Sequence, residues 1–369
     1  MRKAQSAVSS AADDVVVQLR ELWRRYEHHC MQTDSCPSAV LKQDILHHID
    51  KKELLRKITL SLPDCGPADV VLPSLQPLLM AIRDERYTHA QEFHIWSQSL
   101  KQKDIVELCV FKGLIITSLL CLPVCFSLSM GQEGLKGLLT GGLGASQISS
   151  LSLCYCGLGS WSGALLASLL TNSSVREVYI NGNELQCGGA FELLKPVAEN
   201  SQKLAAIQNR TTSITDATEL ISQRSNTTSS RQKKAKSKGK KTKKKREKTK
   251  SGHGAAGGPW LEKLHMFDNS IDNSGQEGPN ELTRFMELLC IIVKFSCYLT
   301  ELDLGENHIG EDGGKVLLEA LRERQAAKLS PIKIQVSTRM SSETFSAILK
   351  SAKELKSGKK RRKTKGKTK

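Results

Sequence analysis

The sequence predicts an α/β protein made of repeated units, each a short strand followed by a helix. The best evidence is residues 148–194, where a shift of 27 residues places Ile148 on Val175 and Leu151 on Val178. Each copy begins with apolar residues spaced two apart, which is typical of a half-buried strand. It continues through a glycine-containing turn into apolar spacings of three and four, which are typical of a helix.

A further observation is a small polar residue at the end of each predicted strand. Asn183 occupies this position in one copy and Cys156 in the other. The chain must turn there, and a buried amide or thiol can satisfy turn backbone groups that would otherwise lack hydrogen-bond partners. The spacing returns twice, at Leu261, Leu264, Met266, Asn269 and Ile271 and, most clearly, at Leu299, Leu302, Leu304, Asn307 and Ile309.

These segments resemble leucine-rich repeats of the ribonuclease-inhibitor type, in which units of about 27 to 29 residues pair each strand with a full α-helix. The resemblance covers residues 61–205 and 259–340. It implies an α/β solenoid with short parallel strands on a concave face and helices on a convex face. It also implies protein–protein interaction, but it names no partner, because such repeats keep the fold and vary the surface.

The N-terminal region is predicted to precede the repeats. Residues 1–12 are expected to be disordered, and residues 13–60 are expected to form a helical cap that shields the apolar end of the first repeat. Val16, Leu19 and Leu22 in this region have helical spacing. Several His and Cys residues lie here too, but their spacing matches no zinc-binding pattern, so we predict neither a metal nor another cofactor.

The first group of repeats, residues 61–205, contains one segment with an alternative interpretation. Residues 113–130 include no charged residue and reach the length at which a membrane span must be considered. Pro123, in the middle of the segment, argues against a membrane span, and the alternation of Val124 and Phe126 with smaller residues favours a buried strand. A poorly packed insertion is a further alternative, and we do not expect the chain to enter a membrane.

The second half of the chain begins with a predicted insertion at residues 206–258. This lysine-rich segment is expected to be disordered, because it has too few large apolar side chains to offset the conformational entropy lost on folding. The second group of repeats follows at residues 259–340. A capping helix at residues 341–355 and a disordered basic tail at residues 356–369 complete the predicted organisation.

The formal net charge of +16 is concentrated in two segments. Residues 231–250 contain 13 Lys or Arg and one Glu, and residues 356–369 contain nine Lys or Arg and no acid, so the remainder is mildly acidic. Such blocks attract nucleic-acid phosphates, although no interleaved aromatic residue could stack on bases. A solubilising role is an equal alternative. The densest clusters, the second of which resembles a nuclear import signal, are Lys243, Lys244, Lys245 and Arg246, and Lys359, Lys360, Arg361, Arg362 and Lys363.

The cysteine pattern indicates a reducing compartment. Eleven cysteines, an odd number without CxxC pairs, are typical of free thiols in the cytosol or nucleus. No apolar run follows the first basic residues, so we expect no secretory signal. Together with the basic clusters, this favours a nuclear or nucleolar location, and a cytoplasmic, centrosomal or ciliary location is the alternative.

The motifs favour binding over catalysis. The sequence has no glycine-rich phosphate loop ending in Gly-Lys-Ser/Thr and no nucleophile elbow. We therefore predict a non-enzymatic scaffold that binds a protein on the concave face. The alternatives are a nucleic-acid-associated protein that uses its lysine-rich segments, and a cytoskeletal or ciliary scaffold. The predicted contact residues alternate with buried strand positions: Glu177, Tyr179, Asn181, Lys263, His265, Phe267, Glu301 and Asp303.

Overall fold

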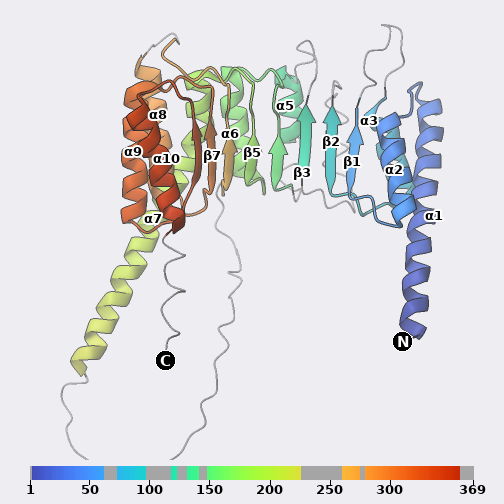
Figure 1. The fold of residues 1–369 in the computed structure, drawn as a ribbon, viewed down its shortest axis with the longest axis horizontal. Helices are drawn as coiled ribbons and strands as arrows, with labels where there is room; N and C mark the ends of the chain where they lie inside the picture. Colours follow the sequence, from blue (N-terminus) through green and yellow to red (C-terminus); the bar gives the residue numbers. More distant parts are fainter. Residues whose placement is uncertain are drawn as a thin grey trace, which may run out of the picture.

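The computed structural model describes residues 2–61, 73–96, 118–122, 131–140, 148–225, 260–274 and 279–357. Within these ranges, eight strands form one sheet in which neighbours are parallel and follow one another in sequence order (Figure 1). The strands are β1 (Lys57–Leu60), β2 (Glu92–Trp96), β3 (Ser118–Leu122), β4 (Ser150–Ser152), β5 (Glu177–Tyr179), β6 (Lys263–His265), β7 (Glu301–Leu304) and β8 (Lys333–Val336).

In the connections that the structure describes, helices return the chain from the end of one strand to the start of the next, because parallel pairing requires a crossover. Consecutive helices pack on one another, so that α6, α7, α8, α9 and α10 form a continuous layer. The structure is therefore an α/β repeat fold. The helices are α1 (Arg2–Gln32), α2 (Ala39–Lys51), α3 (Leu75–Glu85), α5 (Gly131–Thr140), α6 (Gly163–Asn172), α7 (Gln186–Ser225), α8 (Pro279–Phe295), α9 (Gly310–Ala326) and α10 (Ser342–Ser357), with a short 3-10 helix η2 (Ser160–Ser162) before α6.

The two faces of the sheet differ because side chains alternate along each strand. Val178, Leu264, Leu302 and Ile334 occupy equivalent positions and are buried in the core that the helices cover. Polar side chains occupy the opposite face, which we call the open face. Over β5 to β8 the open face consists of Glu177, Tyr179, Lys263, His265, Glu301, Asp303, Lys333 and Gln335.

The buried asparagines connect consecutive repeats, as the sequence pattern predicts. Asn183 Nδ2 donates hydrogen bonds to the carbonyl oxygens of Ile180 at 2.7 Å and Leu153 at 2.9 Å, and its Oδ1 accepts one from the backbone N–H of Leu158 at 3.0 Å. The Cys156 thiol instead donates a weak hydrogen bond to the Cys154 carbonyl oxygen at 3.5 Å. These side chains satisfy backbone groups that the turn leaves without a ladder partner.

A buried arginine stabilises the junction between α8 and α9. Arg324 is fully buried, and its guanidinium donates hydrogen bonds to the carbonyl oxygens of Val293, Ser296, Leu299 and Ser330. Burial lowers the pKa of Arg324 to about 10, which still leaves it charged at neutral pH. The cation therefore compensates the partial negative charge at the C-terminal end of α8.

Two predictions for the N-terminal region were wrong. Residues 2–12, which we expected to be disordered, belong to α1. This segment is rich in alanine and has no glycine or proline to interrupt the helix. The predicted helical cap also ends too late, because residues 57–60 form β1, where Ile58 and Leu60 are buried and β2 supplies the hydrogen-bonding partner.

The boundaries of the predicted disordered segments also differ. Residues 206–225, assigned to the lysine-rich insertion, continue α7, because glycine and proline are absent there too. Residues 356 and 357 likewise belong to α10 rather than to the tail. Residues 226–258 and 358–369 lie outside the described part of the chain.

The uncharged segment at residues 113–130 contributes strand β3 at Ser118–Leu122, which pairs with β2 and β4. The alternating part of the segment, which led us to expect a strand, lies outside the described residues. Among the residues that are described, no helix combines the length and apolarity needed to cross a bilayer.

Candidate functional site

A row of alternating charges crosses the open face from β5 to β8. The strand register places Glu177, Lys263, Glu301 and Lys333 side by side. Lys263 Nζ lies 2.7 Å from Glu177 Oε1, and Lys333 Nζ forms the equivalent ion pair with Glu301. The hydrogen bond to Glu177 raises the pKa of Lys263, and the hydrogen bond from Lys333 lowers the pKa of Glu301. The row is therefore neutralised within the sheet by cross-strand pairs.

A second row lies beside the charged one and contains an aromatic pair. The Tyr179 and His265 rings are 4.6 Å apart between centroids and are inclined at 39°. His265 Nδ1 lies 3.5 Å from Asp303 Oδ2, and its Nε2 lies 3.5 Å from Glu301 Oε1. That Nε2 atom is buried and makes no hydrogen bond to any residue the structure describes. The imidazole is thus held between a phenol ring and two carboxylates.

Asp303 is less accessible than the sequence alone suggests. Only 7% of the residue is exposed, so it supports the open face more than it covers it. Burial favours the neutral acid, but hydrogen bonds from His265 and from the Gly305 N–H outweigh this effect and lower the pKa of Asp303. Gln335 Nε2 donates a further hydrogen bond at 3.2 Å to Asp303 Oδ2. The carboxylate therefore stays ionised and fixes its neighbours in place.

Asn181 and Phe267 lie beyond the strands, because β5 and β6 end at Tyr179 and His265. Asn181 Oδ1 accepts a hydrogen bond from the Phe267 backbone N–H at 3.0 Å, which commits this side chain to joining two repeats. The Phe267 ring lies over Gly305, where an added Cβ would be 2.6 Å from ring atom Cδ2. Of these two predicted contact residues, Phe267 presents the larger apolar surface.

The structure adds three residues to the predicted set. Lys333 and Gln335 complete the two rows on β8, and Tyr155, in the turn after β4, is 49% exposed. The alternation of KIQV before the last helix could have identified the first two in the sequence. Tyr155 had no comparable signal, because it lies between two cysteines in an irregular turn. The predicted basic contacts at residues 243–246 and 359–363 lie outside the described residues.

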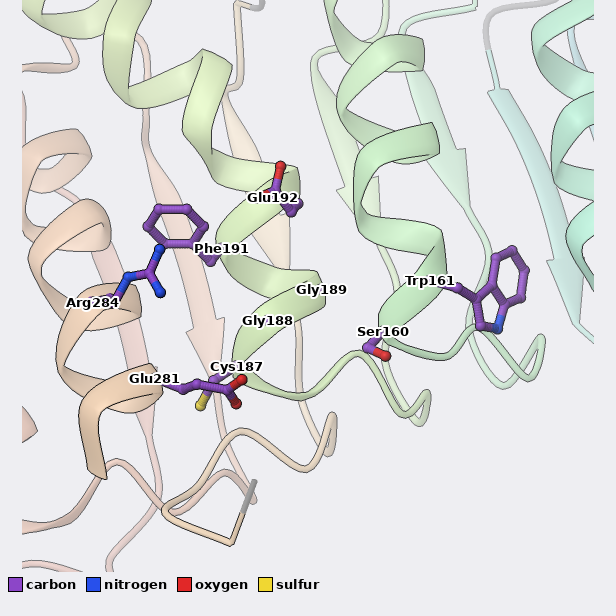
Figure 2. A pocket seen from close by; sticks show the side chains of 9 residues that line it. All are labelled: Ser160, Trp161, Cys187, Gly188, Gly189, Phe191, Glu192, Glu281 and Arg284. Carbon is purple, nitrogen blue, oxygen red and sulfur yellow. The ribbon is translucent and has the colours of Figure 1, made fainter. Parts of the chain in front are cut away.

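A separate cavity of about 400 Å³ lies among η2 and the first turns of α7 and α8. Figure 2 shows the Arg284 guanidinium beside the Phe191 ring, 5.0 Å from its centroid, and the Glu281 carboxylate near Cys187. Where η2 meets α7, the wall includes the backbone of Gly188 and Gly189. The other lining residues are Ser160, Trp161 and Glu192.

The cavity has no activated thiol. Cys187 is buried, its Sγ donates a hydrogen bond to the Asp272 carbonyl oxygen at 3.2 Å, and burial raises its pKa to about 11. A thiol with this pKa stays protonated at neutral pH, and the thiolate is the nucleophilic form. Across the part of the chain that the structure describes, no group of three or more His, Cys, Asp or Glu side chains could hold a metal ion.

Comparison with known families agrees with the repeat architecture. The Leucine Rich repeat family matches residues 295–318, which include the end of α8, all of β7 and the first half of α9. Comparison with curated proteins finds no match. The matched segment contains Leu299, Leu302, Leu304 and Asn307, the residues with the clearest repeat spacing. The chain therefore contains a leucine-rich repeat, embedded in a parallel sheet of the same construction on both sides.

Proposed function

We propose that this chain is a non-enzymatic protein-interaction scaffold, a leucine-rich-repeat solenoid of the ribonuclease-inhibitor type that binds a partner protein through its open face. The open face would be the concave surface of the solenoid. Full helices in the described connections between strands support this repeat type, because shorter repeat types use less regular connections. Leucine-rich repeats generally bind proteins, which supports the assignment to a scaffold.

The observation that carries the proposal is the close ring pair of Tyr179 and His265 beside a row of charges that already neutralise one another. Interface centres are enriched in aromatic side chains and depleted of unpaired charge. A partner that covers this region would gain aromatic contact without removing an uncompensated charge from water. Because Glu177, Lys263, Glu301 and Lys333 pair with one another, we expect binding here to depend only weakly on salt concentration.

The ends of the solenoid fit the same proposal. Helices α1 and α2 lie before the first strand, and α10 packs on α9 and β8 after the last one. We propose that they act as caps that shield the apolar ends of the repeat core. The segment between α7 and β6 is proposed to be an insertion, because β5 and β6 are direct neighbours although equivalent residues lie 86 positions apart.

Site-specific photocrosslinking in cells tests the open face. A photoreactive amino acid at Gln335, which is exposed on β8, should crosslink a partner protein, whereas the same group at Glu319, which is exposed on α9, should not yield that adduct. Tyr179→Ala and His265→Ala should each weaken binding of the crosslinked partner by roughly tenfold or more, as expected for central interface residues. Equal adducts from both positions, or an adduct that survives both substitutions, would show that binding occurs elsewhere.

A further inference from the structure

Two aromatic residues lie at the edge of the sheet where the strands begin, which we call the starting edge. Trp260 precedes β6 by three residues, and Tyr298 precedes β7 by three residues. The strand register pairs Lys263 with Glu301, so the two aromatic residues occupy the same position in consecutive repeats. Their ring centroids are 4.7 Å apart, and the ring planes meet at 69°. The pair is thus a defined structure rather than two isolated surface rings.

Other groups suited to nucleic-acid contact lie on the same edge. Arg176 immediately precedes β5, and its guanidinium is oriented by Glu262, with Nη1 and Oε1 3.0 Å apart and 40% of the side chain exposed. Phe295 is the last residue of α8 and is 40% exposed. Helices run opposite to the strands here, so their C-terminal ends lie at the starting edge. The edge therefore presents aromatic faces next to a guanidinium.

The basic segments of the chain are attached to this same edge. Helix α10 ends there, and α7 continues past it (Figure 1). In the sequence, α10 leads into eight Lys or Arg within residues 358–369, and α7 leads into 13 Lys or Arg within residues 231–250. The chain then returns to the sheet at Trp260, so at most about 35 Å of extended chain separates residue 250 from the aromatic pair. Both blocks of positive charge therefore follow, in the sequence, helices whose C-terminal ends lie on the side of the sheet where Trp260 and Tyr298 lie.

We propose that the starting edge binds single-stranded nucleic acid, with bases stacking on Trp260 and Tyr298 and Arg176 contacting the adjacent backbone or base. Lysine blocks alone attract any polyanion, whereas aromatic faces beside them select a ligand with accessible π-faces. In a duplex the bases stack on one another and are not available to these rings. The basic segments raise the local concentration of the strand, and the described aromatic residues supply the contact that distinguishes it from other polyanions.

This surface differs from the open face, so it can be tested independently of partner-protein binding. The probe is a fluorescently labelled 12-nucleotide oligouridine, titrated with the full-length chain and followed by anisotropy at low and physiological salt. Trp260→Leu and Tyr298→Leu should each weaken binding by roughly tenfold, the size expected for loss of one base–aromatic stack. The slope of affinity against salt should stay the same, because phosphate contacts are retained.

Two further variants control for folding and for nonspecific aromatic effects. Trp161→Leu removes a 41% exposed tryptophan from the opposite edge and should leave the affinity unchanged. Trp260→Phe keeps an aromatic ring and should retain most of the binding, provided that thermal melting shows the fold intact. The proposal is overturned if both leucine variants bind as the unmodified chain does, if duplex DNA of equal length binds as tightly, or if the chain binds no oligouridine at low salt.

Discussion

Replacing Asn307 with leucine tests the structural basis of the repeats most directly. Asn307 is 1% exposed and connects its own turn to the preceding repeat. Its Oδ1 accepts hydrogen bonds from the backbone N–H groups of Asn269 at 3.0 Å and Ile271 at 3.2 Å, and its Nδ2 donates to the Met266 carbonyl oxygen at 2.7 Å. Leucine can form none of these bonds.

The expected loss of stability follows from the three backbone groups that Asn307→Leu leaves buried and unpaired. Each unsatisfied buried group costs about 1–3 kcal/mol. Local rearrangement will recover part of this cost, so we expect a loss of about 4 kcal/mol in the free energy of unfolding. For a chain of this size, this corresponds to a fall of about 10 °C in the melting temperature. It is a large fraction of the stability of an ordinary domain.

The assay combines thermal melting followed by circular dichroism with hydrogen exchange. Repeats are stabilised mainly by their neighbours, so the increase in exchange should be greatest in β6, β7 and the helices that pack on them. Asn273→Leu is the matched control, because Asn273 is exposed in the same repeat as Asn269. An unchanged melting temperature for Asn307→Leu would refute the assignment of the repeat register.

Three other predictions concern packing, acidity and location. Gly163→Ala should lower the melting temperature, because its Cβ would lie 2.1 Å from a backbone oxygen of α7, whereas Gly188→Ala, with its nearest contact at 3.9 Å, should be tolerated. Hydrogen bonds from the Ser341 backbone N–H and the Thr344 hydroxyl, at the start of α10, lower the pKa of Glu311 to about 2. The stabilisation by the ionised carboxylate is therefore present above the unfolded value of 4.5 and is lost as pH falls from 4.5 towards 2. Glu311→Gln should reduce stability at pH 7 and flatten acid denaturation in that window, and an identical pH profile would contradict the assignment. Deleting residues 231–250 and 356–369 from a fluorescently tagged chain should move it from the nucleus to the cytoplasm, and an unchanged location would mean that the repeats determine it.

Local patterns in the sequence predicted the strongest repeats because their causes are local. The spacing of Leu299, Leu302 and Leu304 reflects side-chain alternation along one strand, and Asn307 follows at the turn that this strand must make. The same reasoning failed for β1, which was included in the helical cap and which forms beside β2, a strand from another part of the chain. It also failed for the length of α7, where the scarcity of large apolar residues was interpreted as a sign of disorder.

The candidate site was only partly predictable for a related reason. Strand alternation correctly placed Tyr179 and His265 on the face opposite the core. The face that a strand residue occupies depends only on its position in the alternation along its own strand. The burial of Asp303 and the use of Asn181 as a link between repeats depend on neighbours from other units. The contact residues and the supporting residues therefore look alike in the sequence. They can be distinguished only when the pairing of the strands is known.

The sequence by itself determined the strand–helix unit, its buried asparagine and the concentration of positive charge in two segments, because each is a property of neighbouring residues. The tertiary structure alone decided which side chains meet across repeats. Lys263 neutralises Glu177 although 86 positions separate equivalent residues of β5 and β6, and Trp260 meets Tyr298 because the two strands start at one edge. Such contacts follow from the register of a parallel sheet, which is fixed by packing between units that are distant in the chain.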